Sequence, residues 1–233
     1  MTRVAAAVPA FQAAASVADV VQRTRDVIED VLVVDDGSTD GTGDAARGAG
    51  ADVVVHAANR GKGAALVTAF RTLFARGSDV VVTLDADGQH LPEEIPRLLE
   101  AGRDGADLVL GTRDHLFAEM VAARRLANRL SSLAISWAAG QPLSDVQTGF
   151  RLYTRRLVEA TGFPETRFDA ESAVVVRASR RGFRIVTVPV RLGFADGRTT
   201  SHYRPLVDSL RIARSVMRAR LEAAAAVNPG GRP

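Results

Sequence analysis

Short apolar runs rich in β-branched residues alternate with helix-like segments through the first half of this chain. Alternation at this spacing predicts βαβ units, which give an α/β fold with a mostly parallel twisted sheet, right-handed crossovers and helices on both faces. The predicted strands are Val4–Val8, Val31–Asp35, Asp52–His56, Asp79–Leu84 and Asp107–Gly111, and the predicted helices are Ala13–Arg25, a short one after Asp40, Lys62–Arg76 and Glu93–Ala101.

The second half has a different pattern, with longer helical stretches and fewer strands. Its predicted helices are Glu119–Ala139, Ala170–Arg181 and Pro205–Val227, and its predicted strands are Phe150–Tyr153 and Ile185–Leu192, where Pro189 suits an edge or a strand end. A length of 233 residues fits one large domain. We expect it to cover residues 1–227, as a first half at 1–111 and a second half at 112–227, with a flexible tail at 228–233.

Composition excludes several classes of protein. The chain has no cysteine, which excludes disulfides, thiolate metal sites and a cysteine nucleophile. No apolar run approaches the ~20 residues that span a bilayer, and the N-terminus shows no signal-peptide pattern, so we expect a cytoplasmic protein. The pI of about 10.1 would suit nucleic acid, but aromatic residues make up only 5% and do not interleave with basic ones, so no nucleic-acid partner is expected.

Acidic clusters follow two of the predicted strands, at Asp35–Ser38 and at Asp85–Gln89. Ligands of open parallel sheets bind beyond the carboxyl ends of the strands, and both clusters fall at the same edge. Asp85, Asp87 and Gln89 offer only oxygen ligands, which suits Mg²⁺ or Mn²⁺. The alternative is a solvated acidic turn, since Asp and Gly are ordinary turn residues.

Two phosphate-binding patterns are absent. The spacing of Gly37, Gly41 and Gly43 is not a dinucleotide fingerprint. The segment Asn59–Gly63 is not a Walker A loop, because the required Ser or Thr does not follow Lys62. Lys62 remains a candidate for phosphate contact at a helix N-terminus, where anions are favoured.

A series of short motifs follows along the chain. They are V-V-D-D-G-S-T-D-G-T (33–42), N-R-G-K-G-A-A-L (59–66), L-D-A-D-G-Q-H (84–90), G-T-R (111–113), D-V-Q-T-G-F-R-L-Y (145–153), F-D-A-E (168–171) and V-P-V-R (188–191). Taken together, these motifs resemble those of family 2 glycosyltransferases. The similarity is greatest to the polyprenyl-phosphate branch, of the dolichyl-phosphate mannosyl- and glucosyltransferase type, and it extends over roughly residues 4–212.

The resemblance implies a GT-A fold, with a nucleotide-sugar-binding half at 1–111 and an acceptor half at 112–227. It also implies an inverting, metal-dependent transfer of a sugar from a nucleotide donor. It implies that Asp36 contacts the base or ribose, and that a metal on the donor diphosphate is held by Asp85, Asp87 and Gln89. The nucleotide-sugar-binding candidates are Pro9, Ala10, Phe11, Asp35, Asp36, Ser38, Lys62, Asp85 and Ala86, and the catalytic candidates are Asp87, Asp145 and Glu171.

One segment departs from the family pattern. The family usually has Asn-Glu after the aromatic residue that follows the first strand, and here Gln12 and Ala13 stand there. The choice between UDP and GDP therefore stays open, and a non-catalytic nucleotide-binding relative is an alternative.

The acceptor implied by the resemblance is a polyprenyl phosphate. A phosphate monoester, with a second pKa near ~6, is already anionic at neutral pH and needs cationic clamps instead of a general base. A saccharide or small-molecule hydroxyl acceptor is the alternative, and it would need a base, for which Asp145 and Glu171 are the candidates. The acceptor-phosphate candidates are Arg113, Arg125, Arg129 and Arg204.

The C-terminal helix predicted at Pro205–Val227 is basic and amphipathic. One stripe holds Leu206, Leu210, Met217 and Leu221, and another holds Arg211, Arg214 and Arg218. Such a helix either lies on an anionic membrane surface or packs on the domain with its arginines in solvent. With a lipid acceptor, we expect a peripheral protein on the cytoplasmic face of the membrane, or one with a membrane-protein partner.

Overall fold

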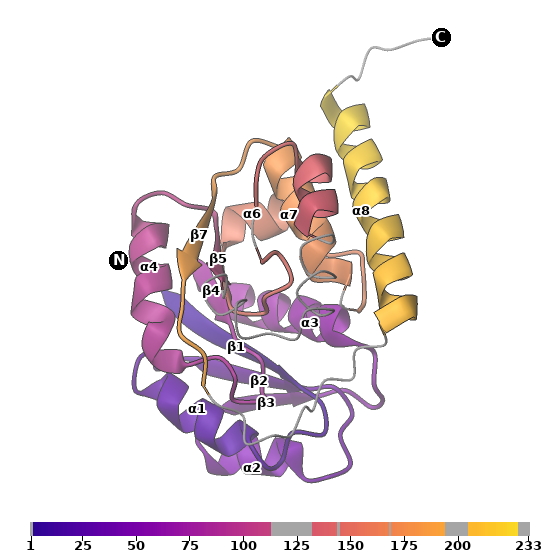
Figure 1. Ribbon diagram of the computed structural model, residues 1–233. Coiled ribbons are helices and arrows are strands. Elements are labelled where there is room, and N and C mark those ends of the chain that lie inside the picture. The colour runs from indigo at the N-terminus through magenta and orange to yellow at the C-terminus, as the bar shows by residue number, and fades with distance from the viewer. Residues whose placement is uncertain (1, 113–131, 144, 168, 194–204, 228–233) are drawn as a thin grey trace.

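A seven-stranded sheet with helices on both faces forms the body of the protein (Figure 1). The computed structural model describes residues 2–112, 132–143, 145–167, 169–193 and 205–227. The strand order is β3-β2-β1-β4-β6-β5-β7. The strands are β1 (Val4–Ala10), β2 (Val31–Asp35), β3 (Asp52–Val55), β4 (Val80–Thr83), β5 (Leu108–Thr112), β6 (Arg151–Thr154) and β7 (Ile185–Pro189).

The sheet is parallel except at β6. Strand β1 pairs in parallel with both β2 and β4, and β5 pairs in parallel with β7. Strand β6 lies between β4 and β5 and runs antiparallel to both. The mostly parallel α/β sheet predicted from the sequence is therefore confirmed, and β6, which comes late in the chain, is the strand that joins its two parallel parts.

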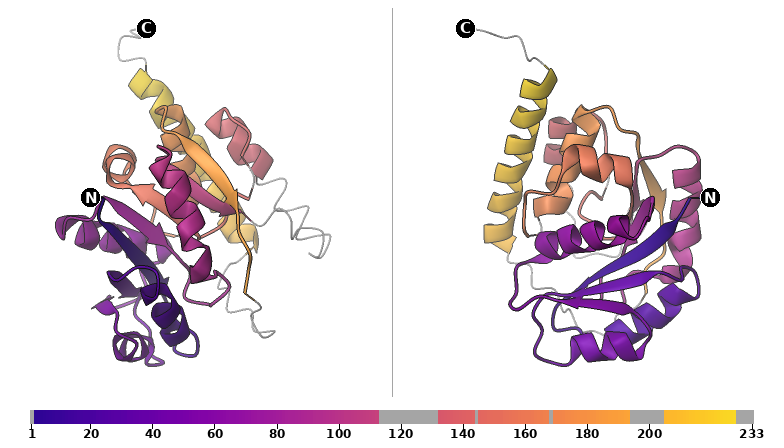
Figure 2. Two further views of the ribbon diagram at one scale, coloured as in Figure 1. Left: turned by 90° about the vertical axis from the view of Figure 1, so that its left-hand side faces the viewer. Right: turned by 180° about the vertical axis from the view of Figure 1, so that it is seen from behind.

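Helices divide the hydrophobic core between the two faces of the sheet. On one face, α1 places Val17, Val20, Val21 and Thr24, one helical stripe, against the strands. The opposite face carries α3, α6, α7 and the helical residues 132–139 (Figure 2). The helices are α1 (Val17–Arg25), α2 (Thr42–Gly48), α3 (Lys62–Ala75), the 3₁₀ turn η1 (Pro92–Glu94), α4 (Ile95–Arg103), α6 (Arg155–Thr161), α7 (Asp169–Arg180) and α8 (Pro205–Val227).

Most predicted elements agree with the structure to within a few residues. Helix α6 was not predicted, and the last predicted strand is shorter than expected, because β7 ends at Pro189 on the edge of the sheet. Leu192 forms an isolated bridge with His90 beyond that end. The first part of the predicted helix Glu119–Ala139 lies outside the described residues, as does most of the loop predicted at Gly193–Ser201.

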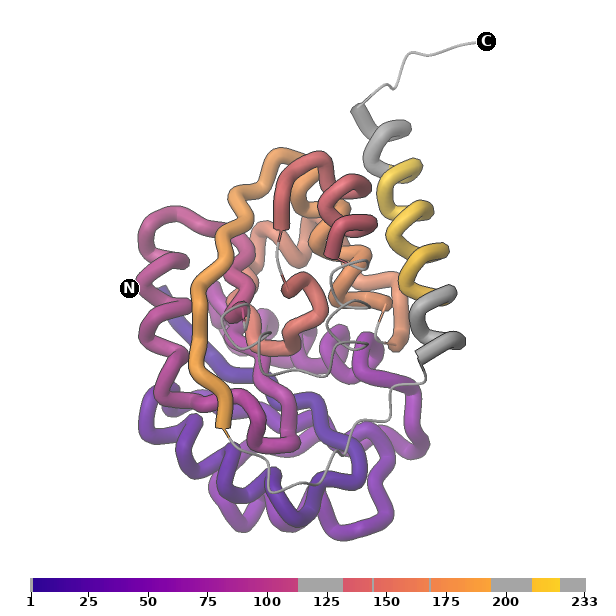
Figure 3. Tube along the Cα trace, in the orientation of Figure 1, coloured from indigo at the N-terminus to yellow at the C-terminus, as the bar shows by residue number. Residues whose placement is uncertain are grey.

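Helix α8 packs along α7 on the outside of the molecule (Figure 3). Its buried stripe is Ile212, Val216 and Ala219. The stripe predicted from the sequence included Met217 and Leu221, which are instead exposed by 44% and 65%. The helix therefore turns two β-branched residues and an alanine to the domain and leaves two large apolar side chains outside.

Across the described residues, no helix combines the length and the apolar character needed to cross a membrane.

Candidate active site

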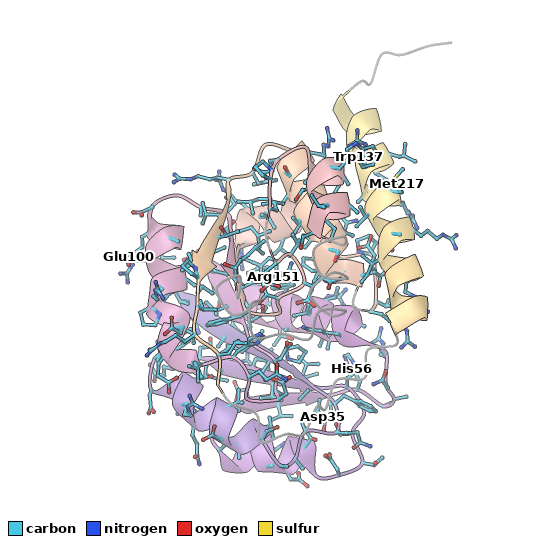
Figure 4. The ribbon with its side chains drawn as sticks, viewed as in Figure 1. Asp35, His56, Glu100, Trp137, Arg151 and Met217 are labelled. Atoms are coloured by element: carbon cyan, nitrogen blue, oxygen red, sulfur yellow. The ribbon has the colours of Figure 1, made fainter. Side chains whose placement is uncertain are left out.

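The carboxyl ends of β1, β2 and β4 meet at one edge of the sheet. The strand order β2-β1-β4 puts the loops after β2 and β4 on the two sides of the loop after β1. Asp35 pairs in register with Ala10, the last residue of β1, and its side chain lies at this edge with that of His56 (Figure 4). The two acidic clusters predicted to share an edge therefore do so.

The loops after β1 and β2 are tied together by hydrogen bonds. Gln12, with a φ of 53°, donates its backbone N–H to Ser38 Oγ at 2.9 Å. The backbone N–H of Ala13 donates to Thr42 Oγ1 at 2.8 Å, and that of Ser38 to Asp35 Oδ1 at 2.9 Å. Gln12 and Ala13, the residues that depart from the family pattern, thus fix the shape of this edge through their backbone.

Asp36 is buried, with 3% of its surface exposed, and its carboxylate points into the protein. Its Oδ1 lies 2.7 Å from His56 Nδ1 and accepts the backbone N–H of Arg60 at 2.9 Å, while Oδ2 accepts that of Gly61 at 2.7 Å. Asp36 therefore anchors the loop that leads into α3, and its contact with a donor nucleotide stays a prediction. His56 was missed from the sequence, where a single histidine after a strand carries no distinctive signal.

Lys62 connects three elements at the centre of the site. Its Nζ lies 2.6 Å from Asp85 Oδ1, after β4, and 3.0 Å from Glu171 Oε2, in the first turn of α7. The Lys62 and Glu171 side chains are only 14% and 6% exposed. Burial by itself lowers the pKa of Lys62, but the charges of Asp85 and Glu171 outweigh it and hold that pKa above its usual range.

The N-terminus of α3 is covered by the segment before α7. The backbone N–H of Ala64 donates to Thr166 O at 3.0 Å. A Cβ on Gly61, whose φ is +97°, would lie 2.5 Å from Thr166 O, and one on Gly63 would lie 2.5 Å from Glu165 O. The glycines of the N-R-G-K-G motif therefore allow this close approach, and Lys62 extends from the covered turn toward the two carboxylates.

The T-G-F-R segment (148–151) lies directly against this ion-pair cluster. A Cβ on Gly149 would lie 2.6 Å from both Lys62 Nζ and Asp85 Oδ2. Thr83, at the end of β4, donates its hydroxyl to Gly149 O at 2.8 Å and fixes the backbone there. A side chain at this position would force the Lys62 ammonium and the Asp85 carboxylate to move.

Arg151 is fully buried next to the cluster (Figure 4). Its guanidinium donates to Thr148 O at 2.7 Å, to Val146 O at 2.7 Å and to Glu171 O at 2.6 Å. The fork of donors thus holds the loop before β6 against the start of α7, which positions Glu171. Gly149 and Arg151 lie in a recognised motif, but the sequence did not assign them these roles.

The loop after β4 is held from several sides. Asp85 N–H donates to His90 Nδ1 at 3.0 Å, and His90 stacks on Phe150 with ring centroids 5.4 Å apart. Ser16 Oγ donates to Ala86 O at 2.6 Å. Within the loop, Gln89 N–H donates to Asp87 Oδ1 at 3.0 Å, and from beyond β7 Gly193 N–H donates to Gln89 O at 2.9 Å.

The carboxylates of this loop fit a divalent cation shared with a substrate. Among the described residues, no group of three or more His, Asp or Glu side chains is arranged to hold a metal by itself. Asp85 and Asp87 are half-buried and supply only oxygen. Mg²⁺ often takes one or two protein carboxylates and completes its shell with phosphate and water, so the donor set fits an ion that arrives with a diphosphate.

The remaining predicted residues fall into three groups. Asp145 is 1% exposed and has a φ of 41°, and Glu171 has a buried Oε1 without a hydrogen-bond partner in the described structure. Pro9 and Ala10 end β1, and Phe11 follows them, half-buried. Arg113, Arg125, Arg129 and Arg204 lie outside the described residues, so their roles stay predictions.

Comparison with known proteins identifies relatives along most of the chain. The sequence is 38% identical over 201 residues to an undecaprenyl-phosphate mannosyltransferase from Micrococcus luteus, covering 81% of this chain and 82% of that one. It is 34% identical over 172 residues to a polyprenol monophosphomannose synthase from Mycolicibacterium smegmatis, covering 69% of this chain and 65% of that protein. The resemblance to the polyprenyl-phosphate branch is thereby confirmed.

A solved structure confirms the GT-A fold. The glucosyl-3-phosphoglycerate synthase from Mycobacterium tuberculosis, crystallised with Mn²⁺, UDP and phosphoglyceric acid, aligns with a TM-score of 0.67 and 25% identity, covering 95% of this chain and 78% of that one. The family model described as "Glycosyl transferase family 2" matches residues 6–162, which include most of β1, all of β2 to β6 and the Lys62–Asp85 pair. This protein is a glycosyltransferase, and the chain belongs to glycosyl transferase family 2.

Proposed function

We propose that this protein transfers a hexose from a nucleotide-sugar, of the UDP-glucose or GDP-mannose type, to a polyprenyl phosphate with inversion at the sugar carbon. The observation that carries the proposal is the Lys62–Asp85–Glu171 cluster at the carboxyl edge of the sheet, next to the half-buried Asp87. The 38% identity to an undecaprenyl-phosphate mannosyltransferase supports the choice of acceptor.

The donor would lie across the ends of β1, β2 and β4. In this proposal, Pro9, Ala10 and Phe11 line the base, and the Asp35–Ser38 loop faces the ribose. Asp85 and Asp87 would hold Mg²⁺ or Mn²⁺, which would neutralise charge on the leaving nucleoside diphosphate. Lys62 would keep Asp85 oriented, because its ammonium binds Oδ1 of that carboxylate.

The acceptor phosphate would attack the sugar carbon from the side opposite the diphosphate. Its oxygen is already anionic at neutral pH, so no side chain has to remove a proton. The proposed clamps for this phosphate are Arg113, Arg125, Arg129 and Arg204. Asp145 would face the donor sugar from the loop that Arg151 holds in place.

A hydroxyl acceptor is the second candidate, and one observation favours it. Glu171 Oε1 is buried and has no hydrogen-bond partner in the described structure, as expected of a base awaiting a hydroxyl proton. The structural neighbour crystallised with phosphoglyceric acid agrees with an acceptor of this kind.

A transfer assay with both acceptors separates the candidates. The protein is incubated with radiolabelled UDP-glucose or GDP-mannose, Mg²⁺ or Mn²⁺, and either undecaprenyl phosphate or phosphoglyceric acid. We expect metal-dependent label in the butanol phase with undecaprenyl phosphate, abolished in Asp87→Asn and retained in Asp44→Asn, whose side chain is 89% exposed on α2. Label found only in a water-soluble product would establish the hydroxyl acceptor instead. Nucleotide binding without turnover for any pair would show a non-catalytic relative.

A further inference from the structure

An apolar and basic face lies on the outside of the molecule, away from the sheet. It consists of Leu133 and Trp137 on the helical residues 132–139 and of Met217 and Leu221 on α8, with Arg214 and Arg218 beside them. We call this set the Trp137 face. Trp137 and Met217 are labelled in Figure 4, at the end of the molecule away from His56.

The four apolar side chains of the Trp137 face are exposed to solvent and lie together, unlike apolar residues scattered singly over a surface. Leu133 and Leu221 are 66% and 65% exposed, Trp137 is 60% and Met217 is 44%. With Val55 on β3, they are all the large apolar side chains that are exposed in the described part of the chain. Their gathering on two neighbouring helices marks an interaction site, because monomeric proteins seldom leave such side chains together in water.

Contacts between the two helices join these side chains into one surface. Arg220 of α8 lies over the Trp137 ring, with its guanidinium carbon 4.0 Å from the ring centroid, and donates to Trp137 O at 2.8 Å. Within α8, Met217 and Leu221 are four residues apart, and so are Arg214 and Arg218, so the two pairs run side by side along the helix.

The charge of the face selects its partner. Residues 211–222 contain four arginines and one acid, Glu222, which pairs with Arg218 at 2.8 Å. A second copy would bring one row of arginines against another, whereas an anionic surface would be attracted. Tryptophan, leucine and methionine beside arginine are the residues that enter the boundary between lipid headgroups and acyl chains.

We propose that the Trp137 face binds the surface of an anionic lipid bilayer. This choice of partner rests on the proposed function, because a polyprenyl phosphate acceptor is held in a bilayer. The buried stripe of α8 stays packed on α7 while the exposed side of the helix contacts the bilayer. The helix therefore attaches the domain to the bilayer without separating from the domain. The aromatic ring and the apolar side chains enter the headgroup region, and the arginines contact lipid phosphates.

The sole tryptophan of the chain makes the test direct, since all tryptophan fluorescence comes from position 137. The whole protein is mixed with vesicles of phosphatidylcholine and phosphatidylglycerol that contain no polyprenyl phosphate and no donor. We expect a blue shift of the emission, quenching by brominated acyl chains, and co-sedimentation. Pure phosphatidylcholine vesicles are expected to bind more weakly by roughly tenfold or more.

Two double variants separate the apolar and the charged contributions. Met217→Gln/Leu221→Gln and Arg214→Gln/Arg218→Gln should each lower binding roughly tenfold. The matched controls are Val55→Gln, an equally exposed apolar residue on β3, and Arg71→Gln/Arg103→Gln, exposed arginines on α3 and α4. Both controls should bind as the unaltered protein does.

Binding is measured without substrates, so it does not depend on transfer activity. If transfer fails but the vesicle results hold, the proposed function is wrong and the surface assignment stands. Equal vesicle binding by all variants would overturn the surface assignment. So would a dimer in solution that Met217→Gln/Leu221→Gln converts to a monomer.

Discussion

Lys62 Nζ lies 2.6 Å from Asp85 Oδ1, so the first turn of α3 is joined to the end of β4 by a largely buried ion pair. Glu171 completes the cluster from α7 at 3.0 Å. The two carboxylates and one ammonium give the cluster a net negative charge. A divalent ion bound by Asp85 and Asp87 would offset that charge. The cluster therefore combines a structural role with the chemistry proposed for this edge.

Replacing Lys62 with methionine should destabilise the fold. The change leaves two carboxylates close together without their cation, and breaking a buried pair in this way costs about 3 kcal/mol. Urea unfolding measures the change in the free energy of unfolding. Lys62→Met/Glu171→Gln should recover part of the loss, and Arg47→Met, from an exposed pair with Asp44, should change stability by less than about 0.5 kcal/mol. A Lys62→Met protein as stable as the original would contradict the cluster's structural role.

Stability should fall at alkaline pH because of Tyr153. Burial raises the pKa of Tyr153 to about 12, against 10.0 as its ordinary value. A raised pKa in the folded state gives stability that is fully present below pH 10 and is lost as the pH rises toward 12. By pH 11 the loss from this group is on the order of 1 kcal/mol. The raised pKa of Lys62 acts in the same direction above its own ordinary value.

Tyrosinate absorbance and unfolding at several pH values test this expectation. The chain has two tyrosines, so Tyr153→Phe and Tyr203→Phe assign the two titrations separately. Tyr153→Phe should flatten the fall in stability between pH 10 and 11. An ordinary titration near pH 10 for the tyrosine that remains in Tyr203→Phe would rule out the burial effect.

Gly149→Ala should damage both the fold and activity. The added Cβ would meet Lys62 Nζ and Asp85 Oδ2 at 2.6 Å, so the ion pair must separate or the loop must move. We expect a loss of about 1–3 kcal/mol in the free energy of unfolding, and transfer reduced well beyond what the lower stability explains. The control is Gly48→Ala at the end of α2, where a Cβ meets nothing within 4 Å and should leave transfer unchanged. Normal transfer by Gly149→Ala would show that the close approach is not needed.

Asp87→Asn should weaken metal use more than it weakens folding. Asp87 is half-buried, and its carboxylate accepts the backbone N–H of Gln89 within the loop, a hydrogen bond that an amide oxygen can still accept. Loss of a ligand carboxylate should raise the Mn²⁺ concentration needed with nucleoside diphosphate by about tenfold or more. Mn²⁺ binding by electron paramagnetic resonance, with Asp44→Asn as control, measures the effect. Unaltered Mn²⁺ binding would remove Asp87 from the metal site.

Local sequence patterns predicted the strands and the place of the site. The β-branched run Val31–Asp35 matches β2, and all five of its residues are buried. A short continuous apolar run is typical of a strand that is covered on both faces of a parallel sheet. The acidic loops after β2 and β4 were expected at one edge because parallel strands end there together. The sequence also pointed to Lys62, Asp85 and Glu171, each with a separate role, but not to the ion pairs that join them.

The parts that were missed depend on tertiary packing. No local signal shows that β6 lies between β4 and β5, since strand neighbours are set by pairing across the sheet. His56 gained its role only from the return of the chain past Asp36. In α8, hydrophobicity pointed to Met217, but the residues that pack on the domain are Ile212, Val216 and Ala219. Ser215 Oγ also donates a hydrogen bond to Asp169 Oδ2, at 2.6 Å.

The position of β6 has a consequence for how the chain is completed during synthesis. The partners that β1, β2, β3 and β4 provide for one another are all present once Thr83 has been synthesised, but both neighbours of β5 come later in the chain. Strand β5 must therefore wait for Arg151–Thr154 to emerge before it can be paired on its inner side. A truncated product ending between Thr112 and Arg151 would leave both edges of β5 open, and open edges of apolar strands promote aggregation. The same arrangement means that the two halves of this enzyme cannot be exchanged between relatives as independent modules, because β6, from the second half, pairs on both sides with strands that begin in the first half.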